Sequence, residues 1–308
     1  MNRPVITKII SLGGVVAFFA LIFSYAAGNL LSIGSFSSAF WTFIASVLFL
    51  SAFVIQVLLV DNFLISAGMI VAQVAAMTIF LGGSLSLVMF AAILIAIALL
   101  ISAYYNGRLE VKNNLEIRFF KTGQVILRGA SSAIAIFVIV AFISILDFED
   151  PAAAKQHIGI AIRPLEPIAS AYIPKFSIEN SLTDISLKLL PKEADSIAPG
   201  ARQLIVQEAA QRVAEVIGNF TGLKIRPADT ITDILYDLTL GRLSNLPPIL
   251  RTVFLVFGGF LIFLLIKFLL IFVNWLALGL GWLLYQALFN LGFFKIQTQS
   301  VEKYVISL

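Results

Sequence analysis

The chain has 308 residues, of which 60% are hydrophobic and only 12% are charged. Soluble domains carry roughly 25% charged residues, so this chain lacks the polar material that would cover a globular surface in water. It contains no cysteine, which excludes disulfides, thiolate metal sites and cysteine nucleophiles. The formal net charge of +4 is modest and unevenly placed, which bears on orientation in a membrane rather than on nucleic-acid binding.

Residues 1–105 are predicted to form a block of four transmembrane helices. A flank with Arg3 and Lys8 precedes an apolar run over residues 9–27, and further runs cover residues 40–60, 63–81 and 85–105. Crossing a bilayer takes about 20 apolar residues, and backbone groups in lipid must be satisfied within the segment, so each run is predicted to be a helix. The first run also resembles a signal peptide, but we favour a retained helix because further spans follow it.

Residues 106–129 form a basic elbow that we expect in the cytoplasm. Short loops rich in Lys and Arg stay on the cytoplasmic side, and four helices from a cytoplasmic N-terminus return the chain there. The aromatic residues among the bases suit contact with anionic headgroups, and a nucleic-acid partner is disfavoured. The expected membrane-surface residues are Arg108, Lys112, Arg118, Phe119, Phe120, Lys121 and Arg128.

Three more spans are predicted downstream, which gives about seven in all. Residues 130–146 form the fifth, and residues 250–294 form a C-terminal hairpin that turns at Asn274 and leaves the tail, residues 295–308, outside. If the last two apolar runs are instead one span and an interfacial helix, the tail is cytoplasmic. Lys267 lies inside these runs, and we favour snorkelling at a helix end over a functional role.

The polar insert, residues 147–249, is predicted to be a small helical extracytoplasmic domain. It holds ten Lys or Arg against thirteen Asp or Glu, and translocated segments lack the basic bias of cytoplasmic loops. The predicted fold class is therefore all-α, a polytopic transmembrane helix bundle with this domain. Residues 201–220 have an amphipathic helical period, and the residues expected to contact a partner are Val206, Ala210, Val213, Ile217 and Phe220.

Two short stretches of the insert resemble each other at an offset of 49 residues. Ser181 precedes Asp184 by three positions, and Thr230 precedes Asp233 in the same way. This spacing is an acidic variant of the capping box that begins a helix. Both a duplicated cap-and-helix unit and a chance likeness of polar caps fit this pattern.

No catalytic, metal-binding or nucleotide-binding motif is present, and we expect neither enzyme activity nor a cofactor. His157 is the only histidine, so the sequence has no histidine cluster for a metal, and it has no Gly-rich phosphate loop. Glutamines within the apolar runs favour interhelical hydrogen bonds. Gly258 and Gly259 could interrupt a helix, and with Lys267 they mark the conduit of the alternative function, a channel or transporter that uses the last two helices.

The chain resembles uncharacterised multi-pass inner-membrane proteins of small-genome bacteria. The resemblance rests on the Leu115-Glu116-Ile117-Arg118-Phe119-Phe120 elbow and on Val301-Glu302-Lys303. It implies a bacterial cytoplasmic membrane and brings no activity or site residues. The leading hypothesis is a non-enzymatic scaffold or accessory subunit of an envelope complex, whose insert docks a protein partner or a second copy.

Overall fold

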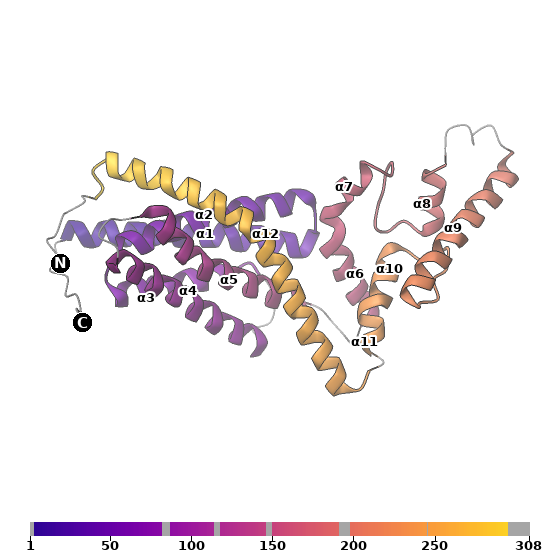
Figure 1. Ribbon diagram of the computed structural model, residues 1–308, viewed down its shortest axis with the longest axis horizontal. Helices are drawn as coiled ribbons and strands as arrows, with labels where there is room; N and C mark the ends of the chain where they lie inside the picture. Colours follow the sequence, from indigo (N-terminus) through magenta and orange to yellow (C-terminus); the bar gives the residue numbers. More distant parts are fainter. Residues whose placement is uncertain are drawn as a thin grey trace, which may run out of the picture.

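The computed structural model describes residues 3–81, 87–113, 118–145, 150–190, 198–244 and 246–294. Within these ranges the chain is helical, with turns and one isolated β-bridge. Figure 1 shows an elongated helix bundle beside a smaller domain that the insert forms. Five helices are long and apolar enough to cross a membrane: Ile6–Ile33, Phe36–Leu59, Leu87–Asn113, Phe119–Ile143 and Val256–Asn290. The predicted all-helical class is confirmed, and the described chain has fewer spans than the seven predicted.

Helices α1 (Arg3–Ile33) and α2 (Phe36–Leu59) form an antiparallel hairpin. The turn between them contains Gly34 at a φ of +65°, a conformation that glycine adopts without steric cost. Both helices contribute large, fully buried side chains to the core, including Phe23, Phe49 and Phe53. Helix α1 is therefore part of the packed bundle.

Helix α3 (Phe63–Thr78) is shorter than the predicted third span. Sixteen residues reach about 24 Å, less than the roughly 30 Å hydrocarbon core. Gly13 lies beside Met69, and Gly28 lies beside Phe80, so α3 runs parallel to α1. A hydrogen bond of 2.5 Å from Gln73 Nε2 to Gln56 Oε1 joins α3 to α2, which confirms the interhelical role expected for glutamines.

Helices α4 (Leu87–Asn113) and α5 (Phe119–Ile145) form a second antiparallel hairpin. Gly107 lies beside Ile126, and Gly129 lies beside Ala103, so the helices pack closely through small residues. The predicted elbow over residues 106–129 is therefore wrong as a loop, because most of it extends these two helices. Residues 114–117, which include part of the motif quoted for the family resemblance, lie outside the described residues.

Helix α12 (Pro248–Asn290) is continuous over 43 residues, so the predicted C-terminal hairpin is wrong. Asn274 lies inside the helix, where its Nδ2 donates to Ser131 Oγ at 3.4 Å. A single polar residue does not end a helix when its side chain has a partner and the backbone hydrogen bonds continue. The helix is about 64 Å long at 1.5 Å per residue, roughly twice the hydrocarbon thickness.

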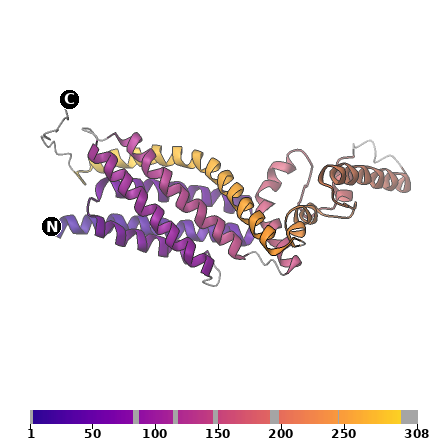
Figure 2. The same cartoon turned by 60° about the horizontal axis from the view of Figure 1, so that its bottom comes forward.

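The two halves of α12 have different surroundings. Its C-terminal half packs on α2 and α5, where Ser51 Oγ donates to the Ala277 carbonyl at 3.1 Å. Its N-terminal half leaves the bundle and runs obliquely toward the insert (Figure 1). Because one helix replaces the hairpin, the start of α1 and the end of α12 lie at the same end of the bundle (Figure 2). Lys8 Nζ donates to the Phe293 carbonyl at 2.7 Å, which contradicts a chain that returns to the far side before residue 295.

The insert forms a helical domain at the opposite end of the bundle. Its elements are α6 (Pro151–Ile162), η1 (Arg163–Leu165), α7 (Glu166–Ser170), α8 (Leu182–Lys188), α9 (Pro199–Thr221), α10 (Ile231–Tyr236), the π-helical turn η3 (Asp237–Gly241) and α11 (Arg242–Ser244). Arg163 Nη1 donates to the Ile33 carbonyl at 3.4 Å, and Gly34 lies against the Ile160 carbonyl. The α1–α2 turn thus supports the domain, and α8 and α9 lie farthest from the bundle (Figure 1).

The two similar stretches of the insert pair with each other. Both capping boxes are formed, by Ser181 with Asp184 and by Thr230 with Asp233. An antiparallel bridge joins Ser181 to Thr230.

The 49-residue offset also relates the hydrogen bonds between the two stretches. Thr183 Oγ1 donates to the Pro227 carbonyl at 2.9 Å, and Thr232 Oγ1 donates to the Ile178 carbonyl at 3.4 Å. The offset relates the two donors, Thr183 and Thr232, and it also relates the two acceptors, Ile178 and Pro227. The two bonds are therefore equivalent under the repeat. The geometry therefore favours a duplicated cap-and-helix unit over a chance likeness.

Candidate functional site

Helix α9 carries two apolar stripes, and the first is used inside the domain. Val206, Ala210 and Ala214 are buried, and Ala210 and Ala214 pack with Leu182 of α8 and Ile234 of α10. Val206 and Ala210 were expected to contact a partner, and this expectation is wrong for both residues. Ile217 is half-buried against the same cluster.

The second stripe of α9 faces outward, and we call it the outer stripe. Its members are Ile205, Ala209, Val213, Val216 and Phe220, which recur at three- and four-residue steps on one helix face. Val216 is 68% exposed and Phe220 is 92% exposed. Of the expected contact residues, Val213 and Phe220 are the exposed ones. The outer stripe lies on the helix farthest from the bundle (Figure 1).

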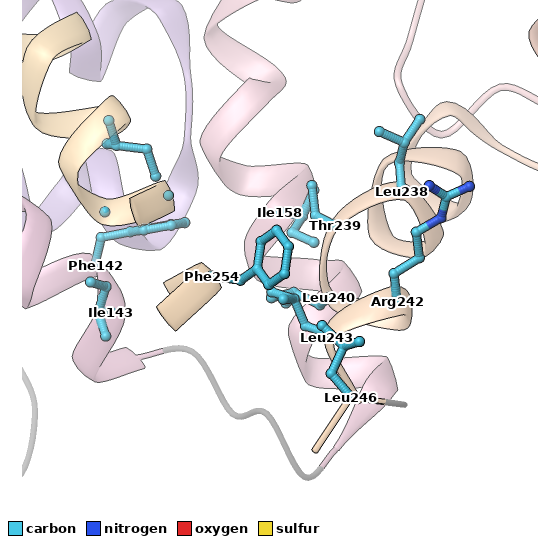
Figure 3. A pocket seen from close by; sticks show the side chains of 13 residues that line it. Phe142, Ile143, Ile158, Leu238, Thr239, Leu240, Arg242, Leu243, Leu246 and Phe254 are labelled. Atoms are coloured by element: carbon cyan, nitrogen blue, oxygen red, sulfur yellow. The ribbon is translucent and has the colours of Figure 1, made fainter. Parts of the chain in front are cut away.

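A pocket of about 680 Å³ lies where the bundle meets the insert, and we call it the junction pocket (Figure 3). It is formed by the end of α5, by α6, by η3 and α11, and by the N-terminal third of α12. Its lining residues are Phe142, Ile143, Ile158, Leu238, Thr239, Leu240, Arg242, Leu243, Leu246, Phe254, Gly258, Gly259 and Ile262. The volume falls within the roughly 300–1,000 Å³ typical of small-molecule sites.

Two features of the backbone shape the junction pocket. Gly258 and Gly259 line it, and a Cβ built at either position meets no atom within 4 Å. The opposite wall includes η3, a π-helical turn, and such turns occur frequently at functional sites. Arg242 is the one charged residue of the lining, and its Nη2 donates to the Thr221 carbonyl.

Lys267 lies in a separate pocket of about 280 Å³ between α5 and α12. Its ammonium donates to Ser131 Oγ at 2.8 Å, to Ser132 Oγ at 3.0 Å and to the Arg128 carbonyl at 3.2 Å. Three acceptors match the three donors of an ammonium. The snorkelling interpretation is therefore wrong, because α5 holds the charge and no helix end is nearby. Gly258 and Gly259 line the junction pocket instead. The three residues expected to form a conduit therefore lie in two separate pockets of the described chain.

The residues expected at the membrane surface divide into buried residues that join helices and residues that are exposed. Arg108 is mostly buried, donates to the Leu58 carbonyl at 2.9 Å and pairs with Asp61. Phe119 is buried and packs on Tyr285. Arg108 and Phe119 therefore hold helices together, which corrects their expected place at the membrane surface.

The remaining members of the expected surface are exposed. Lys121 pairs with Glu110 at 2.7 Å, and Phe120 stacks on Trp282. Arg128 faces outward from α5 and lines the Lys267 pocket, away from the other bases. Lys112 and Arg118 are exposed at the ends of α4 and α5.

The charged groups of the insert support its fold. Lys155 Nζ lies 2.7 Å from Asp233 Oδ1, and this hydrogen bond raises the pKa of Lys155. Partial burial raises the pKa of Asp233, but hydrogen bonds from Lys155 and Thr230 outweigh it, so that pKa lies below its ordinary value. The Ser181 hydroxyl likewise lowers the pKa of Asp184. These groups stabilise helix starts and one tertiary contact.

Among the described residues, no group of three or more His, Cys, Asp or Glu side chains could hold a metal ion. No protein-family model, curated protein sequence or solved structure matches the chain. The five long apolar helices fit a multi-pass helical membrane protein. The interpretation of the site therefore rests on its own geometry.

Sequence reasoning did not find the junction pocket. Its walls come from four segments between Phe142 and Ile262, and most of its lining residues are ordinary leucines, isoleucines and phenylalanines. Gly258 and Gly259 are the only sequence signal there, and the prediction from them is a break in the helix. The structure instead gives them unfilled space beside an unbroken helix.

Proposed function

We propose that this chain is a non-enzymatic multi-pass membrane protein whose insert docks another protein chain through the outer stripe of α9. The observation that carries the proposal is the exposure of Val216 and Phe220 on a helix that already buries a different apolar stripe. Exposed apolar surface in water is unfavourable, and contiguous patches of it mark interaction sites. In an envelope complex, such a protein acts as a scaffold or accessory subunit.

The position of the outer stripe favours a protein over lipid as its partner. Elements α6, α10 and α11 lie between the bundle and α9 (Figure 1). A bilayer that surrounds the bundle helices is therefore separated from α9 by these elements. The partner is either a different protein or a second copy of this chain.

We further propose a bacterial cytoplasmic membrane with the N-terminus in the cytoplasm and the insert outside. Lys112, Arg118 and Lys121 lie at the end of α4 and the start of α5, which packs through Phe119 on the end of α12 beside the start of α1. The positive-inside rule places such an end in the cytoplasm, where exposed bases attract anionic headgroups. The insert at the other end is then extracytoplasmic.

Single cysteines test the docking directly, because the chain has none of its own. Val216→Cys and Phe220→Cys place a photo-crosslinking maleimide on the outer stripe. Gln211→Cys, on the exposed polar face of the same helix, is the matched control. We expect one defined crosslinked protein from both stripe positions and none from Gln211.

The captured protein must then bind the purified full chain, and Val216→Asp must weaken that binding at least about tenfold. One buried apolar side chain contributes roughly 1.5–3 kcal/mol, which corresponds to such a factor. A chain that remains monomeric and gives no stripe-specific crosslink would contradict the proposal.

A further inference from the structure

The walls of the junction pocket carry exposed apolar side chains. Phe254 is 53% exposed, Ile262 is 43% exposed and Leu238 is 38% exposed, and all three line the pocket. Large apolar side chains exposed in one concave place indicate a ligand or a partner.

The place of the junction pocket is the edge of the bundle where α5 ends and the insert begins. Phe142 and Ile143 come from the last residues of α5, and Phe254 and Ile262 lie at the start of the apolar stretch of α12. Exposed Phe257, Phe260 and Leu261 lie between Phe254 and Ile262 on the same helix, outside the lining. The pocket therefore borders exposed apolar surface of a helix that is long and apolar enough to cross a membrane.

The edge of the junction pocket carries a positive charge. The guanidinium of Arg242 is exposed beside apolar Leu238 (Figure 3). Its hydrogen bond to the Thr221 carbonyl fixes the side chain at the edge. A guanidinium has five N–H donors, so this bond leaves further donors for an anion.

We propose that the junction pocket binds one acyl chain of an anionic membrane lipid, with the headgroup phosphate beside Arg242. The apolar walls bury the methylenes of the acyl chain, and burial stabilises each CH₂ by about 0.8 kcal/mol relative to water. Charge-assisted hydrogen bonds from a guanidinium suit phosphate oxygens in particular. The space beside Gly258 and Gly259 admits the chain along α12.

Native mass spectrometry of the purified full chain tests this inference. The protein is delipidated in detergent and then titrated with dioleoyl phosphatidylglycerol or with dioleoyl phosphatidylcholine, which share acyl chains and differ in charge. We expect one lipid to be retained at activation energies that strip the remainder. Phosphatidylglycerol should bind about tenfold more tightly, because the choline cation of phosphatidylcholine offsets the attraction of its phosphate to Arg242.

Three substitutions separate the pocket from the general lipid-facing surface. Gly258→Phe places a side chain in the open space and should reduce retention of both lipids at least about tenfold. Gly279→Phe, on the same helix and also facing open space, should retain lipid like the parent chain. Arg242→Gln should retain the lipid and lose the preference for phosphatidylglycerol.

Equal retention by Gly258→Phe and the parent chain would overturn the inference, as would an undiminished headgroup preference in Arg242→Gln. Absence of a retained lipid in the parent chain would overturn it as well. Gly259→Leu repeats the test if Gly258→Phe lowers the Tm. The docking proposal is independent, because none of these residues lies on the outer stripe.

Discussion

Exposed apolar side chains occur in both the helix bundle and the insert, and they have different meanings in the two regions. On the bundle, Trp41, Phe90 and Phe257 are more than half exposed on helices long enough to span a bilayer. Lipid covers such side chains. In the insert, Val216 and Phe220 are exposed to a still larger fraction, on an amphipathic helix that lies beyond the bundle. There, the proposed partner would cover them.

This difference teaches that burial has to be judged against the local solvent. In the bundle, the exposed side chains are as apolar as the buried ones, because lipid tails surround the protein. In the insert, both stripes of α9 are apolar, but the fold buries only the first and leaves the outer stripe exposed. The outer stripe is therefore informative, and the exposed phenylalanines of the bundle are not.

The largest expected effect concerns the bundle core. Phe53→Ala removes a fully buried ring and should lower the free energy of unfolding in mixed micelles by about 3–5 kcal/mol. Phe257→Ala removes an equally large ring that faces outward at 57% exposure, and should change the same quantity by less than about 0.5 kcal/mol. Equal losses of unfolding free energy would mean that protein contacts, and not detergent or lipid, surround Phe257. That result would contradict the assignment of Phe257 to the lipid-facing surface.

The buried stripe of α9 should respond to added volume. Ala210 is fully buried against α8 and α10, so Ala210→Leu should destabilise the insert by about 1–3 kcal/mol through overpacking. Amide hydrogen exchange in α8–α10 measures this change. Val216→Phe, on the outer stripe at an exposed position, is the control and should leave exchange unchanged. The reverse pattern would mean that the two stripes are wrongly assigned.

The two capping boxes should differ in strength. Asp184→Ala removes a capping partner and should destabilise α8 by about 1 kcal/mol. Asp233→Ala should have a larger effect, about 1–2 kcal/mol, because Asp233 also pairs with Lys155 on α6. Comparing amide exchange in α8 and α10 checks this order, and Lys155→Met should remove the difference.

Acid should weaken the insert and spare the bundle. The folded pKa values of Asp184 and Asp233 lie below their ordinary values. A carboxylate with a lowered folded pKa stabilises the fold above its unfolded pKa, about 3.9, and loses that contribution as pH falls through the folded pKa. Amide protection in α8 and α10 should therefore decrease below about pH 4. Protection in α2 should stay constant, and a simultaneous loss there would contradict the assignment.

The sequence predicted the parts of the fold that depend on local chemistry. The apolar runs predicted membrane helices, and the spacing of Ser181 and Thr230 to the following aspartates predicted capping boxes that the structure contains. These features depend on residues within a turn or two of one another. The pairing of the two boxes through Thr183 and Thr232 follows from the same duplication.

The remaining features required tertiary information. Asn274 stays helical because Ser131, 143 positions away, supplies its partner. Val206 and Val216 are equally apolar, and only the placement of α8 and α10 decides which of them is buried. The tail, residues 295–308, and the Val301-Glu302-Lys303 motif lie outside the described residues.

Cysteine labelling tests the central claim, that another protein covers the outer stripe, most directly. Phe220→Cys and Gln211→Cys are reacted with a water-soluble maleimide in native membranes opened to both sides, and in liposomes with one chain per vesicle. We predict that position 220 labels at least about tenfold more slowly than position 211 in native membranes, and equally fast in the liposomes. Equal rates in native membranes would show that nothing covers the stripe. Protection in the liposomes would show that lipid covers it, and either result would contradict the account.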